Sequence, residues 1–426
     1  MTTNTPPPLS AAFHRFWAGS LSSNLADGIM LTALPMLAAA LTNDPLAVAG
    51  LTAARYLPWL LFGLLAGALV DRVDRVRAMI AANLLRAAAI TALAILTATG
   101  NATVTTLYIV MFAAMTCEIV YDIAARAILP SLARTGIDRA NGRLVGGREV
   151  AQEFAGAPLG GFLFAIAAAL PLAANAGAYA LGALILLGLP LTARRAPTPP
   201  TDQPTTHPAP NPVRAVLHDI AQGLHHIHTD PPLRALILFG AAINLGAAAV
   251  TAVFVLTVQD HHGVPPHLFG VFLATAALGA ILGALLAGNT AHHIGRHRGI
   301  TLGFLAQAAF CVLFALAPNA PVAATAWTLV AAASAYGTVL SSGILQQIVP
   351  EHLLGRVSSA KQTLGFALAP AGALLGGLLA RTDLRLPALF GAAVFTTATL
   401  LILRHLRAAT DRADANERAA RADPAH

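Results

Sequence analysis

The chain has 426 residues, of which 56% are hydrophobic and only 11% are charged. Soluble proteins have about 25% charged residues, so this composition excludes the soluble globular class and indicates a protein of the lipid bilayer. The net charge of +7 comes from arginines in short segments between apolar ones, and nothing in the chain resembles a nucleic-acid-binding module. Nucleic acid is therefore not expected as a partner.

A hydrocarbon core about 30 Å thick requires roughly 20 apolar residues per helix, and twelve such segments follow one another along the chain. They are continuous runs rich in alanine, leucine and glycine, without the alternation of an outer-membrane barrel. We expect their cores at residues 16–41, 46–70, 78–99, 103–129, 144–168, 172–193, 233–258, 265–289, 299–317, 322–349, 359–380 and 386–405. The sequence predicts an all-α membrane protein with twelve transmembrane helices.

Arginine placement predicts the orientation of these helices. Arginines fall on alternate connections, beginning with Arg15 and the group around Arg75, and such connections remain in the cytoplasm. Residues 1–10 lack the apolar region of a removable signal peptide, so the first helix is expected to stay as an anchor. We therefore expect a multi-pass protein of the inner membrane with both termini in the cytoplasm.

One sequence pattern occurs in both halves of the chain. Leu64-Leu65-Ala66-Gly67 precedes Asp71, Arg75 and Arg77, and at one constant offset Leu285-Leu286-Ala287-Gly288 precedes His292, Arg296 and Arg298. Such duplication is typical of transporters built from repeats. We expect a six-helix bundle at 1–193, a cytoplasmic linker with an amphipathic helix at 194–232, a second six-helix bundle at 233–407 and a solvated or frayed cytoplasmic tail at 408–426.

Several enzyme classes are excluded by the absence of their motifs. Lys361 is the only lysine and follows Ala360, so the chain has no phosphate-binding G-x-x-x-x-G-K-[ST] loop; G-x-G-x-x-G, H-E-x-x-H and G-x-S-x-G are also absent. The histidines occur in clusters that indicate solvated basic faces rather than metal ligands. The chain is thus predicted not to be an enzyme and to need neither a metal nor another cofactor.

The strip from Gly67 to Arg77 forms the predicted turn between the second and third helices. Its glycine permits close helix contact, its first acid can accept hydrogen bonds from a helix N-terminus, and its arginines can pair with an acid on the fourth helix. The alternative is that the arginines only set topology. The expected cytoplasmic gate consists of Gly67, Asp71, Arg72, Arg75, Arg77, Asp122 and Arg126. In the second copy His292 replaces the acid, so an equivalent latch is not expected there.

This strip resembles the cytoplasmic signature between helices 2 and 3 of the major facilitator superfamily, with Asp74 in place of the usual glycine. Residues 156–161 resemble the Gly-Pro signature of that superfamily's drug/proton antiporters, although an alanine separates the two residues. The resemblance covers nearly the whole chain, is greatest to the branch with macrolide and siderophore exporters, and implies two pseudo-symmetric six-helix bundles. A hinge in helix 5 is expected at Gly156, Pro158, Gly160 and Gly161, with ordinary helix packing as the alternative.

Ionisable side chains inside apolar segments mark a pathway or a proton relay by default. The proton-coupling candidates are Asp27, Glu118 and Glu153. Counting the rise from each membrane face places Asp27 level with Arg55, and Arg86 level with Glu118, so two ion pairs are expected. The alternative is that these charges are permanently paired and only structural.

The remaining polar residues of the apolar segments suit a substrate cavity with otherwise apolar walls. The cavity candidates are Arg55, Arg86, Asn244, Gln346 and Lys361. We expect a secondary active transporter, monomeric, that exports lipophilic or cationic small molecules in exchange for protons by alternating access. The alternatives are an exporter of an endogenous metabolite such as a siderophore, an uptake symporter, and a membrane scaffold or receptor that does not transport.

Overall fold

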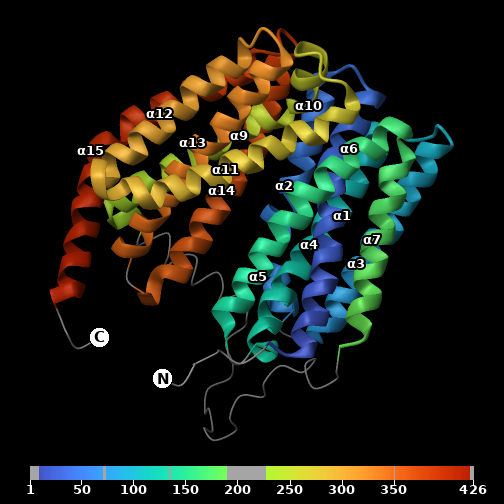
Figure 1. Ribbon diagram of the computed structural model, residues 1–426, viewed down its shortest axis with the longest axis horizontal. Coiled ribbons are helices and arrows are strands. Elements are labelled where there is room, and N and C mark those ends of the chain that lie inside the picture. Colours follow the sequence, from blue (N-terminus) through green and yellow to red (C-terminus); the bar gives the residue numbers. More distant parts are fainter. Residues whose placement is uncertain (1–8, 71–72, 134–135, 190–226, 350, 423–426) are drawn as a thin grey trace, which may run out of the picture. The chain divides into compact units, whose positions relative to one another are not determined.

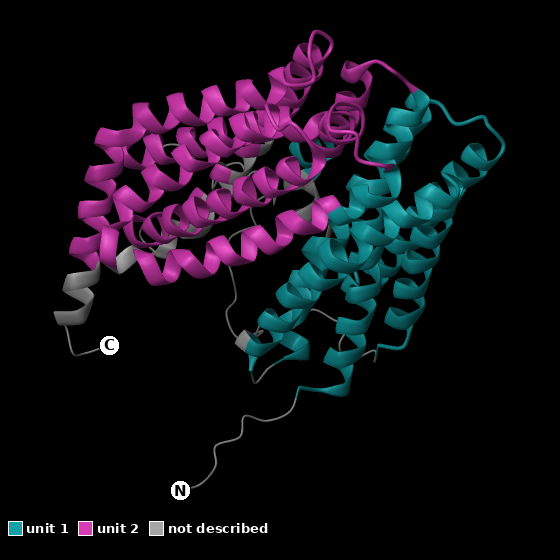
Figure 2. Cartoon of the chain, turned by 45° about the horizontal axis from the view of Figure 1, so that its top comes forward, with its two compact units in different colours: residues 1–41, 57–213, 266–271 teal, residues 42–56, 214–265, 272–426 magenta. Residues whose placement is uncertain are grey.

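The computed structural model describes residues 9–70, 73–133, 136–189, 227–349 and 351–422, and these form two compact units (Figures 1 and 2). Unit 1 consists of residues up to 41, 57–213 and 266–271, and unit 2 of residues 42–56, 214–265 and 272 onward. Each unit is helical, and no strand occurs in the described ranges. Most of the expected linker, 194–226, and most of its amphipathic helix lie outside the described residues.

The helices of the first half are α1 (Ala11–Leu41), α2 (Pro45–Val70), α3 (Arg75–Ala98), α4 (Val104–Leu132), α5 (Ile137–Glu149), the π-helix η1 (Val150–Gly156), α6 (Ala157–Ile166) and α7 (Ala169–Leu187). Those of the second half are α9 (Pro231–Ala252), α10 (Phe254–Leu256), the π-helix η3 (Thr257–His261), α11 (Pro266–Ile294), α12 (Arg296–Ala315), α13 (Ala320–Ile348), α14 (Glu351–Ala380) and α15 (Leu386–Ala422).

Ten of the described helices are long and apolar enough to cross a membrane. Two further predicted spans have a different form. One is divided into α5, η1 and α6, and the other is α14, whose apolar part is the shorter stretch Ala367–Ala380. The described helices are therefore consistent with the predicted twelve spans.

Proline explains why the fifth predicted span is not a uniform α-helix. Pro158 lies in the first turn of α6 and has no N–H to donate to the carbonyl four residues earlier. The preceding turn widens into η1, in which the N–H of Ala157 donates to the carbonyl of Gln152, five residues back. π-helical turns are frequent at functional sites because they re-aim neighbouring side chains. Here the predicted hinge coincides with a change of helix type.

Glycines allow the backbones of α1 and the η1–α6 segment to touch. A Cβ atom added to Gly28 would lie 2.2 Å from the carbonyl oxygen of Gln152, and one added to Gly156 would lie 2.7 Å from the carbonyl oxygen of Leu25. The second half repeats this device between α9 and α14, where a Cβ on Gly372 would lie 2.2 Å from the carbonyl oxygen of Leu245. Small residues at such crossings allow the backbones of transmembrane helices to approach closely.

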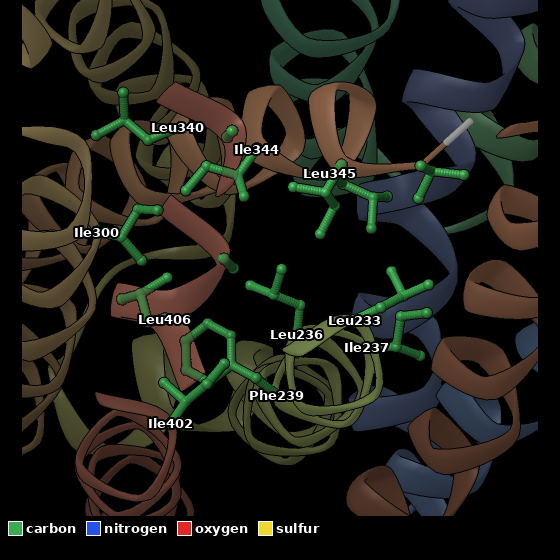
Figure 3. Close-up of a cluster of buried hydrophobic side chains, with 14 of the residues drawn as sticks. Leu233, Leu236, Ile237, Phe239, Ile300, Leu340, Ile344, Leu345, Ile402 and Leu406 are labelled. Atoms are coloured by element: carbon green, nitrogen blue, oxygen red, sulfur yellow. The ribbon is translucent and has the colours of Figure 1, made fainter. Parts of the chain in front are cut away.

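Unit 2 has a large apolar core built from α9, α12, α13 and α15 (Figure 3). Leu233, Ile344 and Leu406 are almost completely buried there, and Phe239 packs edge-on against Phe304 with ring centroids 4.8 Å apart. Edge-to-face aromatic pairs add about 0.5–1.5 kcal/mol beyond area burial. This cluster holds the four helices together at one end of the unit.

The end of α15 packs along one face against other helices of unit 2, while Asp411, Arg412, Ala415 and Asn416 are exposed, so this end is helical rather than frayed. The helix continues to Ala422, and Ala409 and Ala413 on one of its faces are fully buried. Arg412 pairs with Asp230 at the start of α9 at 2.5 Å, and Asn416 donates to the carbonyl of Gln347 at 2.8 Å. Two of the charges expected in solvent, Arg412 and Asp414, therefore contact neighbouring helices while staying partly exposed.

An aromatic cluster lies near the connection between α9 and α11. The ring of Phe254 lies 4.3 Å from Trp327 and 5.7 Å from Phe314, and the ring of His262 lies 5.0 Å from Phe314. His262 lies between the spans Pro231–Ala252 and Pro266–Thr290. Burial lowers the pKa of His262 from 6.5 to about 4, and the neighbouring His261 adds to the effect.

We expect acidification to destabilise the protein through His262. Between pH 6.5 and about 4 the unfolded chain binds a proton at this residue and the folded chain does not, so stability falls as pH falls through this window. The His262→Phe variant keeps an aromatic ring against Phe314 and should lose less thermal stability between pH 7 and 5 than the parent. His267→Gln, at an exposed position, is the control. Parallel melting-temperature curves for the parent and His262→Phe would contradict the prediction.

Candidate functional site

A buried polar network lies among four helices of unit 1, and we call it the Asp27 network. On each helix that supplies more than one member, the members are three or four residues apart and so lie on one face. The members are Ser20, Ser23 and Asp27 on α1, Asn83 and Arg86 on α3, Glu118 and Tyr121 on α4, and Tyr179 on α7. The helical repeat therefore directs all of these side chains toward one place.

Asp27 and Arg86 form the central ion pair of the network. Arg86 Nη1 lies 3.1 Å from Asp27 Oδ1, and the Tyr179 hydroxyl donates to the same oxygen at 2.6 Å. The Arg86 side chain is completely buried, whereas that of Asp27 is 14% exposed. The carboxylate is thus partly exposed, whereas its cationic partner is not exposed at all.

Further contacts hold Arg86 in place. Its Nη2 donates to Asn83 Oδ1 at 2.7 Å, and Asn83 Nδ2 in turn donates to Ser23 Oγ at 2.8 Å. The guanidinium carbon lies 4.3 Å from the ring centroid of Tyr179 and 5.1 Å from that of Tyr121. A desolvated cation over an aromatic face is stabilised by about 2 kcal/mol, so both tyrosines help to keep the guanidinium buried.

Two more acids of α4 act on this network. Glu118 attracts Arg86 electrostatically. Asp122 lies in range of both Asp27 and Arg86, but among charged side chains Arg148 of α5 acts on it most strongly. The site therefore contains three carboxylates near one buried cation, Arg86, while Arg148 and Arg126 are exposed.

The structure corrects the partner predicted for Asp27. Depth counting paired Asp27 with Arg55, but Asp27 forms its ion pair with Arg86. Arg55 lies half-buried in the part of α2 that groups with unit 2. Arg86, also a substrate-cavity candidate, is completely buried in the Asp27 network, and its role in a cavity stays a prediction.

The expected gate is described only in part. Asp71 and Arg72 lie outside the described residues, as does the side-chain environment of Gly67. Asp74 caps the N-terminus of α3 by accepting from the N–H of Arg77, whose own side chain is 77% exposed. Arg75 donates to the carbonyl of Ala127 on α4 at 2.9 Å, rather than to the Asp122 carboxylate.

The corresponding arginine of the second half has a similar position. Arg296, the repeat equivalent of Arg75, donates to the side chain of Gln347 near the end of α13 and pairs with Asp414 of α15 at 3.4 Å. The acid therefore comes from another helix and not from the position of His292. In both halves, the arginine that begins a helix donates a hydrogen bond to a residue near the end of a neighbouring helix.

The remaining candidates occupy separate places. Glu153 is half-buried on η1, one residue after Gln152, which accepts a hydrogen bond from Arg148 at 3.2 Å. Arg126 is exposed on α4. In unit 2, Lys361 of α14 lies beside Gly240 of α9 and Asn244 lies beside Gly365, one turn further, so these two cavity candidates share the α9–α14 contact. Gln346 is exposed near the end of α13.

Neutral polar residues are the part of the site that the sequence analysis missed. Tyr179, Asn83 and Tyr121 all contact the central ion pair or its partners. The available signal was the spacing of Asn83 three residues before Arg86 and of Asn175 four residues before Tyr179, each within an apolar helix.

Comparison with known proteins identifies the family. The model of a family described as transmembrane secretion effector, of the major facilitator type, matches residues 2–425. The enterobactin exporter EntS of Escherichia coli O1:K1 is 30% identical over 223 residues, and so is that of Shigella dysenteriae serotype 1. The match covers 52% of this chain and 50% of the relative, so it spans about half the length of these curated relatives.

Solved transporter structures share the fold at low sequence identity. A bacterial homologue of the iron transporter ferroportin, in an inward-facing state, has a TM-score of 0.74 at 14% identity, with 94% of this chain and 100% of that chain covered. The nucleoside transporter NupG, as its D323A mutant, has a TM-score of 0.73 at 11% identity, with 93% and 99% covered. Because the family model matches nearly the whole chain, the chain is a multi-pass integral membrane protein and no enzyme: it belongs to the transmembrane secretion effector family of major facilitator transporters.

Proposed function

We propose that this transporter exports small molecules in exchange for protons and that Asp27 carries the proton. The observation behind the proposal is the asymmetry of the central ion pair, in which Asp27 keeps some exposure while Arg86 has none. A coupling acid must be reachable by protons and must have a partner whose contacts change when the acid is neutralised. Asp27 meets both requirements.

The network supplies a mechanism for coupling. When Asp27 binds a proton, Arg86 loses its counter-ion but stays buried, and a buried unpaired cation is costly. Glu118 already attracts Arg86, so the guanidinium gains by moving toward α4. Such a shift would alter the packing of α1 against α3 and α4, and would thereby favour the opposite access state. Glu118 and Glu153 remain the alternative proton carriers.

For the substrate we propose lipophilic or cationic small organic molecules. The three carboxylates near Arg86 favour cations, and the largely apolar helices favour lipophilic groups. Outward transport is supported by relatives named as exporters. Export of a siderophore is a second candidate, which the half-length match to the enterobactin exporter favours. An uptake symporter is the remaining alternative, and membership of a transporter family argues against a scaffold.

We further propose that the protein lies in the inner membrane as a monomer, with both termini in the cytoplasm. The arginine pattern of the connections supports this orientation. Cysteine accessibility labelling in intact cells tests it: a cysteine at Asn101 should react with an impermeant reagent, and one at Ser10 should not.

The function is tested by growth inhibition in a host that lacks its own efflux pumps. A panel of lipophilic antibiotics, cationic dyes and siderophores is compared between cells with the protein and cells with an empty vector. For any compound that gives resistance, the purified protein in liposomes should release protons when the compound is added, and an uncoupler should abolish uphill transport.

Each result bears on a different part of the proposal. Resistance together with proton movement supports proton-coupled export. Resistance without proton movement overturns the coupling, and accumulation in place of resistance overturns the direction. Protection restricted to siderophores would replace the drug substrates by the second candidate.

A further inference from the structure

The apolar segments of the second half contain no acid. Between Asp230 and Asp411 the sequence has only three carboxylates, Asp260, Glu351 and Asp383, and each lies at the end of a helix or in a connection. The first half, by contrast, has three carboxylates near Arg86. A cation in the middle of a span of the second half therefore has no acid of that half at its own depth.

Lys361 is such a cation. It is half-buried on α14, and its Cε lies 3.9 Å from the position of a Cβ atom added to Gly240 on α9. Gly240 is nine residues after the start of α9 and twelve before its end, about 14 Å and 18 Å along the helix axis. The four-carbon stem of a lysine is shorter than either distance, so the ammonium group cannot reach a membrane surface by extending along the helix.

No side chain in the described part of unit 2 neutralises Lys361. It forms no ion pair or hydrogen bond with a described residue, and burial is the only influence on its charge. Charged residues inside spans are costly, and they almost always face the interior of a helix bundle or a water-filled cavity rather than lipid. The exposed part of Lys361 is therefore open to water and to molecules that enter from it.

Asn244 supplies a second polar group at the same helix contact. It lies one turn beyond Gly240 on α9, about 6 Å from the level of Lys361, and its Nδ2 lies 2.7 Å from the position of a Cβ atom added to Gly365 on α14. The Asn244 side chain is exposed and has no hydrogen bond with another described residue. Its amide is thus available to a ligand.

The exposed positions of α9 fall on different faces. Leu238 is 56% exposed, as is typical of a lipid-facing side chain, and Asn244 follows it by six residues. At 3.6 residues per turn, the two side chains point about 120° apart. The face with Asn244 is the one that contacts α14, so the two polar groups lie away from the face that carries Leu238.

An apolar side chain adjoins the polar pair. Leu368 lies seven residues after Lys361 on the same face of α14 and is 37% exposed. An ammonium group, a carboxamide and an exposed leucine on neighbouring turns suit a ligand with a compact acidic group and an apolar body.

We propose that Lys361 and Asn244 bind the acidic group of a lipophilic organic acid. One carboxylate oxygen accepts from the Lys361 ammonium group, the other accepts from the Asn244 amide, and the apolar body lies along Leu368. Hydrogen bonds between charged groups are stronger than those between neutral groups, so the site prefers an acid to its amide. The inference rests on the proposed export of small molecules and narrows their class from lipophilic or cationic compounds to lipophilic acids.

The test exploits the fact that Lys361 is the only lysine of the chain. Purified protein in lipid nanodiscs is dimethylated with ¹³C-formaldehyde and a borane reductant, which keeps the positive charge, and the methyl signals are followed by NMR. The amino terminus gives the other signal, and the Lys361→Arg variant assigns the two. We expect Lys361 to react and its signal to shift saturably with biphenyl-4-carboxylate.

Affinities are then measured by calorimetry for three probes of equal size: biphenyl-4-carboxylate, the neutral biphenyl-4-carboxamide and the cationic biphenyl-4-carboxamidine. Protein-free nanodiscs measure partition into lipid. The parent should bind the carboxylate about tenfold more tightly than the carboxamide. Lys361→Met keeps the stem without the charge and should abolish this preference, Lys361→Arg should retain it, and Asn244→Leu should weaken the carboxylate about threefold.

Several results would overturn the proposal. They are an unreactive Lys361 in folded protein, no carboxylate binding above that of protein-free nanodiscs, a preference for the carboxamidine, and an equal loss of all three probes in Lys361→Met. These binding measurements need no proton gradient. Carboxylate binding without proton-coupled export would overturn only the coupling, and export of cationic compounds without carboxylate binding would overturn only this site.

Discussion

The Asp27→Asn protein is expected to fold and insert but to lose uphill export entirely. An asparagine oxygen can still accept from Arg86 and from the Tyr179 hydroxyl, so the local shape is kept. It cannot bind or release a proton, so the step that couples substrate movement to the gradient is lost. The measurement is compound export against a gradient, by resistance and in liposomes, at equal membrane expression.

The stability cost of this substitution should be modest. Loss of one member of a buried ion pair commonly costs about 3–5 kcal/mol, but Glu118 also attracts Arg86 and limits the cost. Exchange of substrate at equal concentrations needs no net proton movement and should persist. That persistence distinguishes lost coupling from a misfolded protein.

Asp44→Asn is the matched control for this substitution. Asp44 pairs with Arg381 at 2.6 Å on the surface of unit 2, and hydrogen bonding to Arg381 holds the pKa of the Asp44 carboxyl below its ordinary value. Exposed ion pairs contribute only about 0–1 kcal/mol, so export should be unchanged. Uphill export by Asp27→Asn at the parental rate would exclude Asp27, and the same assay would then be applied to Glu118→Gln and Glu153→Gln.

Gly28→Ala should strongly destabilise the folded protein. The new Cβ would lie 2.2 Å from the carbonyl oxygen of Gln152 and 2.8 Å from its Cα, so α1 and η1 would have to separate. Overpacking costs about 1–3 kcal/mol, and here the obstacle is backbone that cannot rotate away. The expected result is a markedly lower melting temperature and reduced yield of folded protein.

Gly177→Ala provides the comparison within the same unit. This glycine lies in α7 with no atom within 4 Å of an added Cβ. Alanine is favoured over glycine inside a helix by about 1 kcal/mol, so this variant should be as stable as the parent or more stable. Equal melting temperatures for Gly28→Ala and Gly177→Ala would show that the α1–η1 contact does not limit packing.

The helical membrane fold was predictable from composition and segment length, because a bilayer allows few alternatives to a helix for an apolar segment. Position along the chain also identified Asp27, Arg86 and Glu118 as unusual. It did not identify their pairing, because depth along a helix axis does not specify which side of the helix a residue occupies. Arg55 has a suitable depth, but Arg86 has both the depth and the direction.

Two other features could not be seen in the sequence for related reasons. The Asp27 network depends on Tyr179, whose hydroxyl contributes little to hydropathy yet holds the carboxylate at 2.6 Å. The docked end of α15 looked polar on all sides because its apolar face consists of small alanines, Ala409 and Ala413. Small residues bury completely when a partner helix is close, and only the structure supplies that partner.

The two halves of this chain differ in the position of the acid that accompanies the arginines of the repeated strip. The N-terminal strip contains its own acid, Asp71, whereas the second strip has His292 at that position, and Arg296 takes its carboxylate from Asp414 of α15. A chain whose last helix ended before Asp414 would therefore leave Arg296 without this carboxylate.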